Sequence, residues 1–203
     1  MNYVNVKTKL NNLPIFSLRD IQMVDKNFRN ANMSAWIKKG YVNRIRQEWY
    51  MFSDFKPESY DYFYISNKIY SPSYISLESA LEYYGVIPEA VQEITAVSTQ
   101  KTITFDTEFG TYIYRKLKNE LFWGYEISTF NNKGISIASL EKTLLDYFYL
   151  NSIDSTLDLE GLRLNKEVLN KNLDMDKLDI YTQRFNVNIV QNRINLLKSY
   201  LHA

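Results

Sequence analysis

The chain has 203 residues, of which 45% are hydrophobic, so it fits one large or two small folded domains and is not a disordered chain. Its formal net charge is +1, it has no Cys, and its single His is His202; this composition excludes disulfides, thiolate nucleophiles and Cys-ligated zinc, and nearly excludes serine-hydrolase triads and His metal centres. Because we find no charged-then-apolar leader and no long apolar run, we expect a soluble cytoplasmic protein that needs no membrane, cofactor or metal.

The chain opens with a predicted helix over residues 2–13, where Tyr3, Val6 and Leu10 share one face. Pro14 ends this helix, because proline lacks an N–H group and disfavours helical geometry in the residue before it. We expect this helix to pack beneath the two helices that follow.

A second short helix is predicted to begin at Ser17. The Ser17 side chain can cap it, and the carboxylate of Asp20 lies three residues on, where it can reach back to the first free N–H groups. Leu18, Ile21 and Val24 recur at helical spacing and form one apolar stripe. A polar break at residues 25–27 separates this helix from the next.

The third helix is predicted to run to about Lys39, with Gly40 at the position that ends many helices. Met33, Trp36 and Ile37 share one face. The roughly opposite face is polar, and most of its side chains are short. It carries Asn27, Asn30, Ala31, Ser34 and Lys38. Since Asn can bond adenine bidentately and Ser can bond several bases, this helix is our candidate for a recognition helix.

A basic two-stranded ribbon is predicted next. Alternation over residues 42–46 would place Arg44 and Arg46 on one side, Gln47-Glu48 would form the turn, and residues 49–52 would return as a strand. Both arginines suit phosphate contact or minor-groove entry, although solvated strand positions would explain them as well. The order helix, turn, helix, ribbon over residues 17–52 is typical of a winged helix-turn-helix.

Charge supports this interpretation independently. Residues 1–55 hold nine Lys or Arg and four Asp or Glu, a net charge of +5, whereas residues 56–203 carry −4. Such asymmetry indicates a polyanionic partner for the first part, which we expect to be double-stranded DNA. The expected contacts are Asn27, Arg29, Asn30, Ser34, Lys38, Lys39, Arg44 and Arg46. The alternative is a protein-docking module. Lys38 and Lys39 could equally interact with the helix dipole at the C-terminal end of their helix.

We predict a domain boundary at residues 54–59, which gives a winged helix-turn-helix domain over 1–55 and a second domain over 58–203. The second domain begins with an ambiguous aromatic stretch at residues 60–70 and a helix over residues 76–84. A short turn or helix follows at Pro88-Glu89. Strands at residues 94–98, 102–105 and 110–114 are expected to form an antiparallel meander, with an edge strand at 121–125.

The strongest helix of the second domain is predicted over residues 137–150, followed by two or three more helices between 155 and 203 with breaks at Gly161 and residues 170–174. The last helix is expected over residues 187–201. The fold class is therefore α+β: an N-terminal winged helix-turn-helix, then a mixed domain with a small antiparallel sheet and several helices.

Two stretches are similar to a known family beyond their periodicity. Residues 74–81, with 84–89 and 94–97, form the first, and residues 137–146 form the second. Together with the basic N-terminal unit they resemble the AbiEi antitoxins of type IV, abortive-infection toxin–antitoxin systems that act in phage defence. The resemblance implies a transcriptional autorepressor that binds inverted-repeat operator DNA upstream of its own operon. It further implies that the second domain neutralises a nucleotidyltransferase-like AbiEii toxin.

Charged residues near these motifs are the candidates for toxin neutralisation. Glu141, Lys142 and Asp146 match the family motif, although Lys142 and Asp146 could simply form a bridge between residues four apart on a helix. Glu78 and Glu82 share a helix face that is either solvated or turned toward the toxin.

One enzymatic alternative comes from Asp106 and Glu108, which stand with Lys116 in strand-like sequence. Mg²⁺-dependent nucleases hold the metal with carboxylates and steady the scissile phosphate with a Lys. Because Glu108 is followed by Phe109-Gly110 and the acids resemble turn residues, we expect a protein that is not an enzyme and has no catalytic residues.

Overall fold

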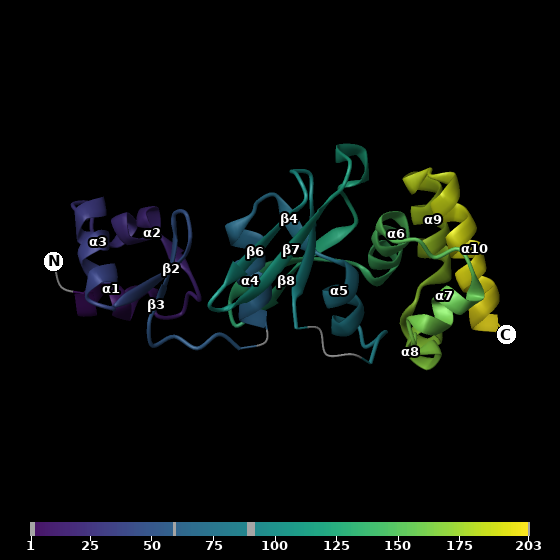
Figure 1. The fold of residues 1–203 in the computed structure, drawn as a ribbon, viewed down its shortest axis with the longest axis horizontal. Coiled ribbons are helices and arrows are strands. Elements are labelled where there is room, and N and C mark those ends of the chain that lie inside the picture. The colour runs from purple at the N-terminus through teal and green to yellow at the C-terminus, as the bar shows by residue number, and fades with distance from the viewer. Residues whose placement is uncertain (1–2, 59, 89–91, 203) are drawn as a thin grey trace.

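The computed structural model describes residues 3–58, 60–88 and 92–202, and it is of mixed α+β class. Three parts follow one another along its long axis: an N-terminal unit, a central sheet and a C-terminal group of helices (Figure 1). Within the described ranges, every helix is too short or too polar to cross a membrane. The turn expected at Pro88-Glu89 lies partly outside the described residues.

The N-terminal unit contains three helices and a three-stranded antiparallel sheet of strand order β1-β3-β2. Its elements are α1 (Tyr3–Leu10), β1 (Phe16–Ser17), α2 (Leu18–Val24), α3 (Asn30–Lys38), β2 (Val42–Arg46) and β3 (Trp49–Phe52). The predicted cap of α2 is confirmed: Ser17 Oγ accepts from the Asp20 N–H group, and the Asp20 carboxylate accepts from the Ser17 N–H group.

Two details of α3 differ from the sequence prediction. Asn27 precedes the helix, in a turn where its N–H group donates to the Asp25 carboxylate at 2.9 Å. Ile37 is 39% exposed, so of the three residues expected on the inner face only Met33 and Trp36 are buried. The core beneath them is aromatic, with Phe28 at 4.8 Å from Trp36 between ring centroids.

The central part carries a six-stranded mixed sheet of strand order β6-β7-β5-β4-β9-β8. In chain order its elements are α4 (Tyr60–Ile69), β4 (Ser73–Ile75), α5 (Leu77–Tyr83), β5 (Ile94–Ser98), β6 (Ile103–Thr107), β7 (Gly110–Lys116), a 3-10 helix η1 (Asn119–Leu121), β8 (Tyr125–Phe130) and β9 (Lys133–Ala138). The ambiguous stretch that begins at Tyr60 is thus a helix.

The expected antiparallel meander is wrong in one pairing. β7 pairs antiparallel with β6 but parallel with β5, so β6 is an edge strand and β5 lies inside the sheet. The burial of the strands follows this arrangement: four of the five residues of β5 are buried, whereas burial alternates along β6. A strand covered on both faces is typical of parallel pairing, and an alternating strand is typical of an antiparallel edge.

Three other features also differ from prediction. Residues 137 and 138 end β9, and α6 (Leu140–Leu150) begins only after the Ser139 cap. The expectation of a strand at 121–125 is wrong: Leu121 ends the 3-10 helix η1, and the edge strand β8 begins only at Tyr125. The C-terminal region forms four helices where two or three were expected: α7 (Thr156–Gly161), α8 (Lys166–Asn172), α9 (Met175–Phe185) and α10 (Asn188–His202).

The central sheet has a different core on each face, because successive strand residues point in opposite directions. Tyr74, Val97 and Ala138 pack with α5, α6 and the C-terminal helices. Their neighbours Ile75, Ala96 and Ile137 belong to a second cluster, which includes α4 and residues of the N-terminal unit: Ile15, Ile45 and Met51. The N-terminal unit is therefore held against the sheet by apolar contacts and not only by the chain connection.

Candidate nucleic-acid interface

The helix α3 presents most of its surface to solvent, since Met33 and Trp36 are its only buried residues. The predicted contacts Asn27, Arg29, Asn30, Ser34, Lys38 and Lys39 are all exposed. Ser34 Oγ donates to the Asn30 carbonyl at 3.2 Å, which leaves its oxygen free to accept a further bond. A helix this open, with short polar side chains, can approach another surface closely.

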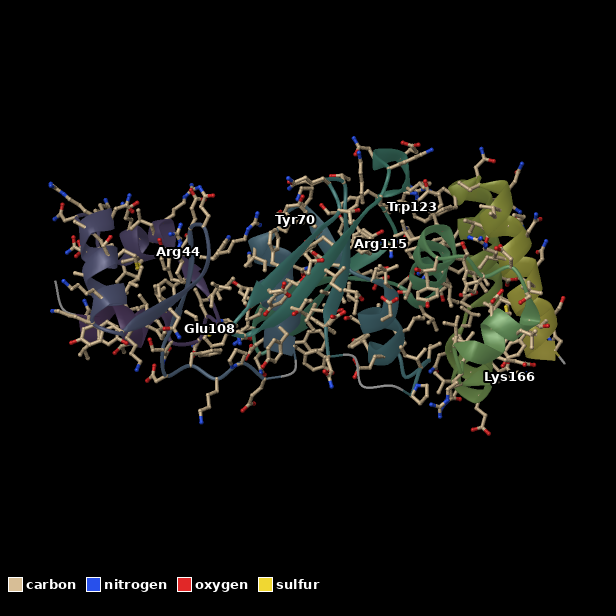
Figure 2. All side chains as sticks on the ribbon, viewed as in Figure 1. Arg44, Tyr70, Glu108, Arg115, Trp123 and Lys166 are labelled. Carbon is tan, nitrogen blue, oxygen red and sulfur yellow. The ribbon has the colours of Figure 1, made fainter. Side chains whose placement is uncertain are left out.

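A groove of about 820 Å³ runs between α2, α3 and the β2–β3 ribbon. Asn30 and Ser34 line it from α3, and Arg44 lines it from β2. The fold thus brings together three of the predicted contacts from two elements, while Asn27, Arg29, Lys38 and Lys39 lie outside the groove lining. Arg44, which is labelled in Figure 2, is exposed, whereas Arg46 is half-buried.

The groove also contains Arg19, which was not among the predicted contacts. Arg19 is exposed on α2 and lies outside the apolar stripe of Leu18, Ile21 and Val24. Sequence periodicity could have found it, since a basic residue off the stripe of a helix that precedes a recognition helix faces outward.

Arg46 does not lie beside Arg44, and the expectation that both share one side of the ribbon is wrong. The register shifts between these two residues, so Arg44 pairs with Tyr50 and Arg46 with Trp49, and the extra residue breaks the alternation. The Arg46 guanidinium lies 3.8 Å from the Phe105 ring centroid and donates to the Ile69 carbonyl in the central part. Arg46 thus joins the N-terminal unit to the sheet, and this placement does not suit a DNA contact.

Replacing Arg46 with Ala should lower the free energy of unfolding by about 1–3 kcal/mol, because a ring contact and a charged hydrogen bond are lost together. Arg44→Ala, an exposed change on the same strand, should stay within about 0.5 kcal/mol. Urea denaturation of both variants measures the difference, and equal effects would contradict the joining role of Arg46.

Lys142 and Asp146, predicted to serve toxin neutralisation, are both fully buried. The ammonium of Lys142 donates to the Asp146 carboxylate and, at 2.8 Å, to the Tyr74 hydroxyl. That carboxylate also accepts from the Tyr74 hydroxyl at 2.9 Å and from Ser76 Oγ at 3.0 Å. Side chains enclosed in this way cannot touch a partner, so the prediction of a contact role for them is wrong, and the alternative of an internal bridge is right.

Burial acts on the pKa of each member of the pair. It lowers the pKa of Lys142 and raises that of Asp146, while the opposite charge alongside counteracts each shift. Gly124 is required where the chain passes this site: its φ is +75°, and a Cβ there would lie 3.0 Å from Lys142 Cγ. The structure therefore encloses the pair closely.

The three remaining acidic candidates lie in different surroundings. Glu141 is only 3% exposed, accepts from the Asp174 N–H group at 3.3 Å, and lies 2.9 Å from the ammonium of Lys177, so it joins α6 to α9. Glu78 is half-buried near Tyr147, where its charge adds to the burial that raises the pKa of Tyr147 to about 12. Glu82 alone is exposed.

The residues of the nuclease alternative are not brought together. Asp106 Oδ1 accepts from Thr111 Oγ1 at 2.9 Å, at the start of β7, whereas Lys116 ends that strand. Lys116 lies five residue steps along the strand from Thr111, or about 17 Å away. Among the residues that the structure describes, no group of three or more His, Asp or Glu side chains could hold a metal ion.

Comparison of the chain with protein-family models finds no match, and comparison with curated proteins finds none either.

Proposed function

We propose that residues 1–55 are a winged helix-turn-helix that binds double-stranded DNA, and that the protein is an autorepressing antitoxin of the AbiEi type. The main support for DNA binding is the groove that is lined by Asn30 and Ser34 of α3 and by Arg44 of the ribbon. The element order and the strand order β1-β3-β2 support it, because a recognition helix followed by a ribbon is how this motif contacts a duplex.

Each side chain has a distinct role in this proposal. Asn30 bonds a base edge in the major groove, with adenine as the partner that suits its amide. Ser34 contacts a neighbouring base, and Arg44 and Arg19 hold phosphates on either side. The net charge of +5 on residues 1–55 draws the duplex to this end, while the acidic remainder at −4 turns it away from the rest of the chain.

Binding of the full-length protein to a fluorescent duplex from its own upstream region tests this proposal. Arg44→Ala should weaken binding about five- to tenfold and lower the slope of log K against log salt by about one, because one phosphate contact is removed. Lys171→Ala, an exposed change on α8 in the C-terminal part, is the matched control and should leave both unchanged.

Wild-type protein that does not bind at low salt would contradict the proposal. It would instead favour the protein-docking alternative, in which a stoichiometric complex with a neighbouring gene product resists salt. Repression should require two half-sites, since each copy supplies one recognition helix.

Neutralisation of an AbiEii-like nucleotidyltransferase toxin belongs, in this proposal, to the central and C-terminal parts. The similarity of residues 74–81 and 137–146 to the family supports this assignment. Of the acidic candidates, Glu82 is exposed and Glu78 half-buried, both on α5, so these two are available for contact with a partner. The double change Glu78→Gln with Glu82→Gln should therefore weaken rescue of cells that express the toxin, while operator binding stays as in wild type.

A further inference from the structure

The β6–β7 hairpin ends in a hydrogen-bonded tip that carries two exposed acids, Asp106 and Glu108. Thr107 and Gly110 form its last pair, and Thr107 Oγ1 accepts from the Phe109 N–H group at 3.1 Å. Gly110 has a φ of +117°, which a residue with a side chain rarely adopts. These bonds hold the backbone of the tip, and Asp106 Oδ1 accepts from Thr111 Oγ1 at 2.9 Å, so the tip is not a loosely held loop.

This tip lies beside the N-terminal unit. A groove of about 350 Å³ separates the tip residues 106–109 from β2 and from Ile37 of α3. Figure 2 shows Glu108 on the side of the central sheet that faces the N-terminal unit, which carries Arg44. Arg44 and Ile37 also line the larger groove assigned above to DNA, so the acids border the proposed binding surface directly.

The position of the tip relative to the N-terminal unit is fixed by contacts already described. Arg46 lies over the Phe105 ring, one residue before Asp106, and Ile45 and Met51 share an apolar cluster with the sheet. The hairpin that carries the acids therefore cannot move away from a duplex without breaking this contact. A groove of 350 Å³ also has no room for a double helix between the tip and the ribbon.

We propose that Asp106 and Glu108 form an acidic stop at the edge of the DNA-binding surface, which repels the phosphate backbone and keeps the duplex on α3 and the outer side of the ribbon. This inference rests on the proposed function. Charges within a Debye length of about 8–10 Å interact with a phosphate, so the stop acts on any duplex that spreads from Arg44 toward the sheet. Since non-specific binding is almost wholly electrostatic, the stop lowers it more than operator binding, which base contacts help to hold.

The full-length variant Asp106→Asn with Glu108→Gln tests this inference, because both changes keep size while they remove two charges. Binding to a duplex of random sequence should tighten about five- to tenfold, with less than half of that gain on the operator duplex. The protected region in hydroxyl-radical footprints should also lengthen on the side of the sheet. Thermal unfolding checks that the hairpin persists, since the amide oxygen introduced in place of the Asp106 carboxylate can still accept the bond from Thr111.

The matched control is Glu160→Gln with Glu167→Gln, which removes two exposed acids from α7 and α8 at the far end of the molecule (Figure 1). An equal gain in the control would show that net charge and not placement matters, and would overturn the inference. No gain in the hairpin variant would overturn it as well, while leaving operator binding by wild type intact. Wild type that binds neither duplex would instead overturn the proposed function.

Discussion

Asp146→Ala should lower the free energy of unfolding by about 3–5 kcal/mol, the cost of removing one partner from a buried ion pair. The change leaves the Lys142 ammonium enclosed with only the Tyr74 hydroxyl as a hydrogen-bond partner, and it also removes the acceptor of Ser76. Chemical denaturation followed by circular dichroism measures the loss. Glu82→Ala, an exposed acid in the same part of the chain, should change the free energy by no more than about 0.5 kcal/mol.

A second variant separates the charge effect from packing. Lys142→Met with Asp146→Leu removes both charges and keeps the volume filled, so it should recover much of the stability that Asp146→Ala loses. If the double variant were less stable than Asp146→Ala, the pair itself would be stabilising, and the cost would not come from an unpaired charge. The comparison therefore decides why α6 contains two charged residues in a closed core.

Arg193→Ala is the second change with a large expected effect, about 2–4 kcal/mol, because it leaves buried carbonyl groups without donors. The Arg193 guanidinium is buried, and it donates to the Phe148 carbonyl at 2.6 Å and to the Asn151 carbonyl at 2.8 Å. It also bonds Asp154 at 2.7 Å. Arg193 of α10 thus supplies hydrogen-bond donors to carbonyl groups at the C-terminal end of α6. It also holds the segment that follows α6, through its bond to Asp154.

Arg193→Lys gives a graded test, since an ammonium keeps the charge but cannot reach all three acceptors in one plane. Its loss should lie between those of wild type and Arg193→Ala, and Lys171→Ala should be neutral. Identical losses for the Lys and Ala variants would indicate that fork geometry carries the whole effect. A neutral Arg193→Ala would contradict the role assigned to this side chain.

Features that depend on neighbours along the chain can be predicted from the order of the residues alone. The cap formed by Ser17 and Asp20 and the order of helices and ribbon in residues 3–52 follow from local signals, and the structure contains both. The polar surface of α3 and the charge asymmetry between the two parts are also readable from residue types. Local hydrogen bonds and helical periodicity act over three or four residues, so a single sequence reports them.

Contacts between segments that lie far apart in the sequence can be seen only in the folded chain. Nothing within residues 94–116 sets β5 parallel to β7, because strand partners are chosen by packing across the whole sheet. Because the ribbon contains one extra residue between them, Arg46 contacts the central sheet while Arg44 lines the groove, although both occur in the same alternating run. Lys142 and Asp146 are charged by sequence yet wholly buried, because Tyr74 and Ser76 arrive from about 70 residues away to bond them. The cost of burying a charge depends on such partners, and only the folded chain supplies them.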